Sequence, residues 1–120
     1  MARLMSVSLT ERAVVERRKT VTRRLGWKFL KPGDRLTLCR KVMGRKKGEP
    51  LVRLAEVEVV DVKREPLSHI RFRPHDPAAE GFVGFSPEMF VQFFTEHMRC
   101  DRETEVTRIE WRYLDVGELQ

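Results

Sequence analysis

"RRKTVTRRLGWKFLKPGDRLTL", residues 17–38, is the stretch of this sequence that says most about its fold. Its first eight positions hold five cations and two threonines, and residues 31–34 read Lys-Pro-Gly-Asp. Proline and glycine at these positions favour a tight turn. After it, apolar and polar residues alternate from Asp34 to Val42. This alternation predicts a strand with one buried face.

The spacing of Lys19 and Thr22 within the cationic segment limits what these two residues can do together. In an extended strand, side chains three positions apart point to opposite faces, whereas in a helix or a turn they meet. A shared role for Lys19 and Thr22 therefore requires a turn or a helix end at this point of the chain.

The residue types in this segment suit nucleophilic chemistry. A threonine hydroxyl is a poor nucleophile at neutral pH and needs a base beside it, and a lysine can serve when burial or neighbouring cations lower its pKa. A carboxylate would complete the set by orienting the lysine or by moving a proton. The sequence offers many carboxylates, and Glu80 differs from most because Gly81 after it permits a close approach of the backbone.

The composition is that of a single globular domain over residues 1–120, with 41% hydrophobic and 35% charged residues. The net charge of +6 favours contact with nucleic acid or nucleotides, but it identifies no site. No apolar run approaches the roughly 20 residues of a membrane helix, and the first residues lack a signal-peptide core. We therefore expect a cytoplasmic protein that does not contact a membrane.

The cysteines and histidines predict neither a disulfide nor a metal site. Cys39 and Cys100 lie far apart in the sequence, and the three histidines show no ligand spacing. We expect no metal and no cofactor.

Several strands and one short helix are predicted before residue 74. We expect a strand over 3–9, then a capping box formed by Ser8 and Glu11 that begins a helix over 10–18. The loop "MGRKKGEP", residues 43–50, is the tip of a hairpin whose second strand covers 51–65. Apolar residues change parity inside that strand, which predicts a bulge or bend. A short strand is expected over 69–73.

Residues 86–99 form the strongest predicted helix, with Ser86 as its cap and Pro87 at its first position. Its wide apolar stripe can be the wall of a pocket or a face packed on a sheet, and we favour the second interpretation. A last strand is expected over 105–114. Together these elements predict an α+β domain, a small, largely antiparallel β-barrel with two or three flanking helices.

The motifs at 19–24 (K-T-x-T-x-R), 31–34 (K-x-G-D) and 80–82 (E-G-F) resemble the ASCH family, whose fold is related to the PUA domain of RNA-modifying proteins. Their order and spacing match over nearly the whole chain. The resemblance implies a PUA-like barrel that recognises a nucleobase or RNA. Some small family members are amidohydrolases that remove acyl groups from the N4 position of acylated cytidine, and others are reported as ribonucleases.

Carried over to this sequence, the family's catalytic lysine, threonine and glutamate fall on Lys19, Thr22 and Glu80. The arginine after the threonines is Arg24, whose planar fork suits a carbonyl or phosphate oxygen. For substrate binding we also consider Thr20, which can hold the turn. Trp27 can stack on a base or pack as a core or rim residue.

Two classes of function remain open at this point. The first is an enzyme that hydrolyses the amide of an N4-acylated cytidine, and the second is a non-catalytic RNA- or nucleic-acid-binding module. In the second, phosphates would contact a set of basic side chains: Arg17, Arg18, Arg23, Arg45, Lys46 and Lys47. A ribonuclease is a further alternative. In each case we expect a monomer whose partner is RNA, a nucleoside or a nucleobase.

Overall fold

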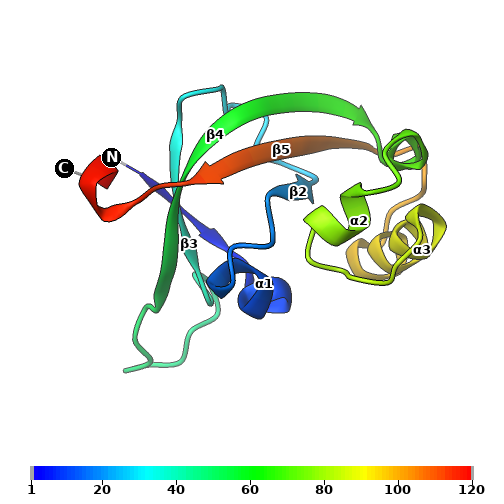
Figure 1. Cartoon of the computed structure of the whole chain (residues 1–120). Helices are drawn as coiled ribbons and strands as arrows, with labels where there is room; N and C mark the ends of the chain where they lie inside the picture. Colours follow the sequence, from blue (N-terminus) through cyan, green and yellow to red (C-terminus); the bar gives the residue numbers. More distant parts are fainter. Residues whose placement is uncertain (1, 120) are drawn as a thin grey trace.

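A five-stranded sheet forms the body of the protein in the computed structural model, which describes residues 2–119 (Figure 1). The strands are β1 (Arg3–Ser6), β2 (Val21–Arg24), β3 (Arg35–Cys39), β4 (Arg53–Pro66) and β5 (Glu105–Tyr113). Their order in the sheet is β1-β3-β4-β5-β2. Only β1 and β3 pair in parallel, and the other neighbours are antiparallel.

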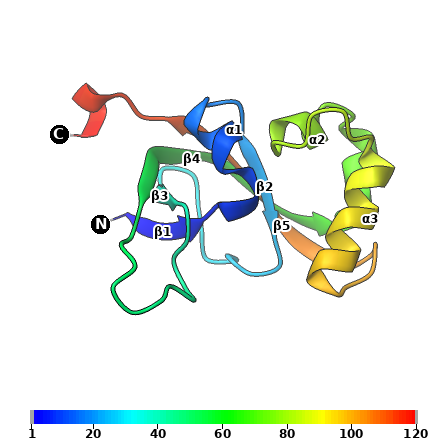
Figure 2. The same ribbon diagram turned by 90° about the horizontal axis from the view of Figure 1, so that it is seen from below.

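The helices are short, apart from one. They are α1 (Glu11–Val15), α2 (Asp76–Ala79), α3 (Pro87–Met98) and the 3₁₀ segments η1 (Ser8–Thr10), η2 (Leu67–Phe72) and η3 (Val116–Leu119). The sheet curls into a half-barrel, with α2 and α3 at one end of the long strands β4 and β5 (Figures 1 and 2). The predicted small, largely antiparallel barrel with few helices is therefore confirmed.

Two clusters of buried apolar side chains hold this arrangement together. The first lies inside the curled sheet and includes Met5, Leu36 and Trp111. The second lies between α3, η2 and the start of β5 and includes Phe94, Ile70 and Val106. Strand β5 contributes to both clusters, so it joins the half-barrel to the helical end.

The predicted irregularity in the second strand of the hairpin is confirmed. The pairing of β4 with β5 changes register between Val59 and Asp61, which leaves Val60 as an extra, exposed residue. Such a bulge bends a strand and increases its twist. The sheet can therefore curl along β4.

Two sequence predictions about local structure are wrong. Residues 69–73 do not form a strand, because the β4–β5 ladder ends at Pro66 and the chain turns into η2, which buries Ile70 and exposes Phe72. The capping box at Ser8 is also absent. The chain passes through η1 before α1 begins, and no side chain caps α1.

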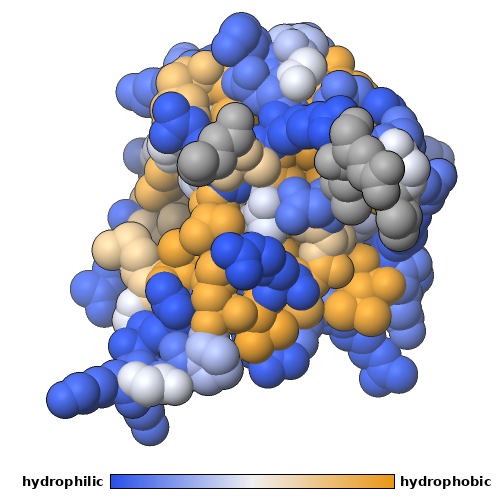
Figure 3. Space-filling view, turned by 90° about the vertical axis from the view of Figure 1, so that its left-hand side faces the viewer, coloured by the Kyte–Doolittle hydropathy of each residue, from blue (hydrophilic) through white to orange (hydrophobic). Residues whose placement is uncertain are grey.

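The other turn and cap predictions are confirmed. The hydroxyl of Ser86 accepts a hydrogen bond from the backbone N–H of Met89 (3.1 Å), and Pro87 begins α3. Gly33 in the Lys-Pro-Gly-Asp turn has φ +96°, which glycine adopts without strain. The loop between β3 and β4 extends away from the sheet at the lower left of Figure 1. On that side of the molecule, hydrophilic residues surround an apolar area (Figure 3).

Candidate functional site

The end of α1 leads directly into the segment that contains Lys19 and Thr22. Arg17 has a left-handed backbone (φ 59°), and the N–H groups of Arg18 and Lys19 both donate to the carbonyl of Ala13 (2.7 and 3.1 Å). This helix end turns the chain directly into β2, which contains Thr22. The turn lies just before Lys19 and does not span positions 19–22, and Lys19 and Thr22 share only the lining of one cavity, described below.

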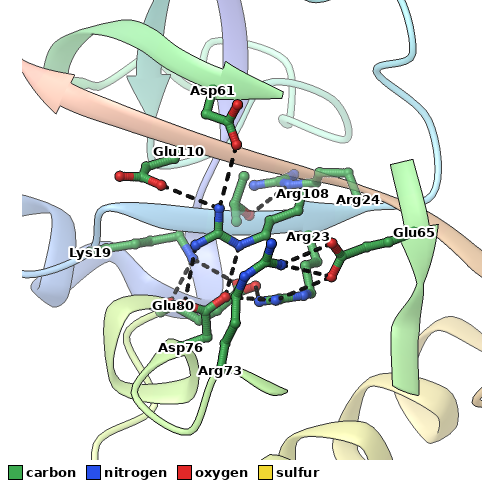
Figure 4. Close-up of polar contacts among 11 residues, drawn as sticks. Lys19, Arg23, Arg24, Asp61, Glu65, Arg73, Asp76, Glu80, Arg108 and Glu110 are labelled. Carbon is green, nitrogen blue, oxygen red and sulfur yellow. Dashed lines mark hydrogen bonds and ion pairs between the residues drawn. The ribbon is translucent and has the colours of Figure 1, made fainter. Parts of the chain in front are cut away.

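The side chain of Lys19 is buried and faces Glu80 (Figure 4). Its Nζ atom donates to the backbone carbonyl of Glu80 at 2.6 Å and lies 3.4 Å from Oε1 of the same residue. Burial, and to a smaller extent the nearby Arg24 and Arg23, lower the pKa of Lys19 to about 8, although Glu80 opposes the shift. A substantial fraction of neutral amine is thus present near pH 8.

The backbone of Lys19 is fixed as firmly as its side chain. Its carbonyl oxygen accepts hydrogen bonds from Trp111 Nε1 (2.9 Å) and from the Tyr113 hydroxyl (2.5 Å). Both donors come from β5, so the aromatic residues of the last strand position Lys19.

Glu80 reaches the site because α1 and the end of α2 pack closely. Gly81 has φ +103°, and a Cβ atom there would lie 3.0 Å from Thr10 and 3.1 Å from Ala13. The N–H of Thr20 also donates to the carbonyl of Ala79 (2.9 Å). The close approach predicted from Gly81 is confirmed.

Arg23 corrects one sequence prediction. Its side chain is fully buried, so the expectation of a solvated or phosphate-facing arginine is wrong. It donates to Glu80 Oε2 at 3.0 Å and to Asp76 Oδ2 at 2.6 Å, because β2 directs it toward the carboxylates of α2 and its C-terminal end. Its Nε atom is buried without a hydrogen-bond partner among the described residues.

Further ion pairs extend this network around Asp76 and Glu65 (Figure 4). Arg108 donates to both oxygens of Asp76 (2.8 and 3.2 Å), and Arg73 donates to Glu65 (2.9 Å). Burial alone would raise the pKa of Asp76, but the hydrogen bonds from Arg108 and Arg23 bring it below its ordinary value. The network therefore stays charged and holds Arg23 against Glu80.

Thr22 and Arg24 form a second, smaller unit. The Thr22 hydroxyl is buried and accepts a hydrogen bond from Arg24 Nε (3.2 Å), while Arg24 Nη2 donates to the carbonyl of Ser6 (2.7 Å). Burial lowers the pKa of Arg24. No hydrogen bond joins Lys19 to Thr22 in the described part of the chain, and Arg24 has no carboxylate partner there.

These residues line one cavity of about 310 Å³. Its charged residues are Lys19, Arg23, Arg24 and Glu80, and the hydroxyl side chains of Ser6, Ser8, Thr10 and Thr22 also line it. Its apolar part consists of Val7, Leu9, Phe82, Phe90, Phe93, Phe94 and Met98, with His97 beside them. The apolar stripe of α3 is therefore both a packed face and a wall of the cavity. Phe90 and Phe94 belong to the second core cluster and also line the cavity.

The remaining candidates lie elsewhere. Trp27 does not line the cavity; it packs against the first core cluster, with its ring 5.5 Å from that of Phe29. Thr20 is half-buried and contributes backbone hydrogen bonds to Ala79 and Trp111.

The other predicted basic residues are exposed. Arg17 and Arg18 pair with Asp115 (3.3 Å) and Glu16 (2.7 Å), respectively. Arg45, Lys46 and Lys47 lie exposed in the loop between β3 and β4. Sequence reasoning missed Asp76, Arg108 and the ring of Phe82 as parts of the site, although Phe82 follows Glu80 and Gly81 in the E-G-F motif.

The cysteines are not paired, since both Cys39 and Cys100 are free. Within residues 2–119, no three potential metal-ligating side chains of His, Cys, Asp or Glu gather into a group. Over the same residues, the helices are too short or too polar to cross a bilayer.

Comparison with known proteins identifies the fold. No family model matches the sequence, and no curated protein matches it either. Among solved structures, a DUF984 protein from Enterococcus faecalis V583 superposes with a TM-score of 0.66 at 15% identity, covering 96% of this chain and 77% of that one. ASCH proteins from Zymomonas mobilis (TM-score 0.59, 11% identity, 98% and 74% covered) and Lactobacillus crispatus JV V101 (0.57, 12%, 88% and 70%) also superpose. The chain therefore has the ASCH/PUA-like fold, as the sequence motifs indicated.

Proposed function

We propose that the chain binds a nucleobase in the cavity described above and hydrolyses the amide of an N4-acylated cytidine. The observation that carries this proposal is the convergence of Lys19, Thr22 and Glu80 in one cavity, with the pKa of Lys19 lowered to about 8. A cavity of about 310 Å³ is at the small end of the range of roughly 300–1,000 Å³ for ligand sites, which suits a single nucleoside.

In this proposal, the hydroxyl of Thr22 attacks the acyl carbonyl and neutral Lys19 takes its proton. Arg24, which already contacts the Thr22 hydroxyl, is placed to stabilise the negative charge that develops on the carbonyl oxygen. Before substrate binds, the Thr22 hydroxyl accepts a hydrogen bond from Arg24 and has none to Lys19, so the amine must move from Glu80 toward Thr22 in the complex.

The second half of the reaction uses Glu80. The carboxylate is paired with Arg23, so it must first receive a proton from Lys19 once the ammonium has returned to it (3.4 Å in the free protein), and then pass it to N4 as the C–N bond breaks. Water then attacks the acyl ester of Thr22, releases the carboxylic acid and restores the hydroxyl. The net reaction converts the amide and water to cytidine and the acid.

The test is turnover of a panel of N4-acylcytidines by the wild type and by three variants, Lys19→Met, Thr22→Ala and Glu80→Gln. Each variant should lower kcat/KM at least about a hundredfold, since each removes a group that acts on the reacting atoms. Lys28→Ala is the matched control, because Lys28 is exposed and outside the cavity. No turnover by the wild type, or full activity in all three variants, would reject the proposal.

The pH dependence gives a second test of the same mechanism. Lys19 is active only as the neutral amine, so kcat/KM should rise as the pH increases through about 8 and then level off. A profile that is flat between pH 7 and 9 would exclude Lys19 as the base.

A second candidate function, non-catalytic RNA binding, is supported by one observation. Arg45, Lys46 and Lys47 are consecutive, exposed and without an ion-pair partner among residues 2–119. Binding of a single-stranded RNA through them should weaken steeply with salt, whereas turnover of a neutral nucleoside should not. Salt-independent RNA affinity would reject this second candidate.

A further inference from the structure

The polar part of the cavity contains an arginine, Arg24, whose charge no paired carboxylate balances among the described residues. Three cations, Lys19, Arg23 and Arg24, line it together with one carboxylate, Glu80. Glu80 pairs with both Lys19 and Arg23, and Arg23 is also paired with Asp76 at 2.6 Å. Arg24 is the cation of the cavity that has no carboxylate partner in the described part of the chain. The buried Nε of Arg23 also lacks an acceptor there. Buried donors of this kind favour a ligand that brings acceptor oxygens.

Another part of the cavity lining is aromatic. The rings of Phe90 and Phe94 are buried (2% and 6% exposed), and Phe82 lies near Phe90 and Phe93, with ring centroids 5.5 and 5.0 Å apart. Aromatic side chains pack well against another ring. An apolar cavity of about 150 Å³ in another protein holds a benzene molecule, so about 310 Å³ leaves room for one ring and a polar group.

The exposure of the lining residues shows which part of the cavity is deep. Lys19, Thr22 and Glu80 are at most 3% exposed, whereas Leu9 (61%) and Met98 (38%) lie at the opening. Burying the ribose hydroxyls without hydrogen-bond partners would cost free energy, so in the proposed complex the ribose and the leaving base occupy the opening. The acyl group then occupies the deep part, between the arginines and the buried rings.

We propose that the deep part of this cavity is a binding site for an aromatic ring that carries a carboxylate or an acyl carbonyl. The ring packs against the aromatic wall formed by Phe82, Phe90, Phe93 and Phe94, and the oxygens contact Arg24. If the proposed function holds, on which this part of the inference rests, the enzyme prefers an N4-aroylcytidine over N4-acetylcytidine. Hydrolysis then releases an aromatic carboxylate. The binding of the free acid needs no catalysis.

The first experiment measures the affinity of the wild type for benzoate, acetate and benzamide by calorimetry. Benzoate should bind at least about tenfold more tightly than acetate, which lacks the ring, and than benzamide, which lacks the charge. Arg24→Gln should weaken benzoate about tenfold and benzamide less than about threefold. Arg12→Gln is the matched control, since Arg12 is exposed and does not line the cavity.

A second pair of variants tests the aromatic wall. Phe93→Ala should weaken benzoate several-fold, whereas Phe72→Ala, which removes an exposed ring elsewhere, should not. If Phe93→Ala unfolds the protein, Phe93→Leu keeps most of the apolar volume without the ring. Benzoate affinity that is no higher than that of acetate, or that is unchanged in Arg24→Gln, overturns the inference.

Kinetics separate this inference from the proposed function. If the protein binds benzoate through Arg24 but hydrolyses no N4-acylcytidine, the proposed function fails and the aromatic-acid site stands. If it hydrolyses N4-acetylcytidine faster than N4-benzoylcytidine and does not bind benzoate, the proposed function stands and this inference fails.

Discussion

Two basic regions of this protein contain the same residue types in opposite environments. Lys19, Arg23 and Arg24 are buried or nearly so beside carboxylates and aromatic rings, whereas Arg45, Lys46 and Lys47 extend into solvent from the loop between β3 and β4. Burial lowers the pKa of a lysine. It also means that removing one member of an ion pair leaves an uncompensated buried charge, which destabilises the fold. Exposure leaves the charge available to any polyanion. The same residue types therefore differ in pKa and in ion pairing because the fold excludes water from one region and not from the other.

The largest expected difference between the two regions is in stability. Arg23→Ala leaves Glu80 and Asp76 buried without their shared partner, and removing one member of a buried ion pair costs about 3–5 kcal/mol. Arg45→Ala should change the free energy of unfolding by less than about 0.5 kcal/mol. Urea denaturation of both variants checks this. Equal stabilities would mean that the buried network does not hold the fold.

The pH dependence of stability tests Lys19 itself. Folding lowers its pKa from 10.5 to about 8, so between these values the unfolded chain binds more protons than the native one. The free energy of unfolding should therefore rise with pH from about 8 to about 10.5, by up to about 3 kcal/mol from this group. The difference between the wild type and Lys19→Met, measured by urea denaturation at several pH values, isolates this contribution. A difference that does not change with pH would contradict the lowered pKa.

Substitution of one glycine in each region compares how much backbone strain and crowding each region tolerates. Gly81 beside Glu80 and Gly48 in the exposed loop both have positive φ (+103° and +84°). Alanine at Gly48 meets no atom within 4 Å and should cost only about 1 kcal/mol of backbone strain. Alanine at Gly81 also meets Thr10 and Ala13 and should cost about 2–3 kcal/mol. It should also lower turnover, because Glu80 moves with it.

The small, largely antiparallel barrel, the bulge in the second hairpin strand and the helix at α3 could be predicted from the sequence, because turn residues, parity and caps are local signals. The resemblance to the ASCH family also placed Lys19, Thr22 and Glu80 together. The prediction for Arg23 was wrong, because charged residues are rarely fully buried. Its carboxylate partners, Asp76 and Glu80, lie more than 50 residues away in the sequence. The short apolar pattern at 69–73 was ambiguous, since only the end of the β4–β5 ladder excludes a strand there.

The smallest expected effect concerns the exposed loop. Replacing Arg45, Lys46 and Lys47 together by serine should leave the free energy of unfolding within about 0.5 kcal/mol, because none of them has an ion-pair partner in the described part of the chain. Turnover of a neutral N4-acylcytidine should also be unchanged, since the three residues do not line the cavity. If single-stranded RNA binds through them, the slope of log affinity against log salt should become shallower by about 2, which is three contacts at roughly 0.7 each. A loss of nucleoside turnover in this variant would mean that the exposed cations act together with the buried ones, and the division between the two regions would fail.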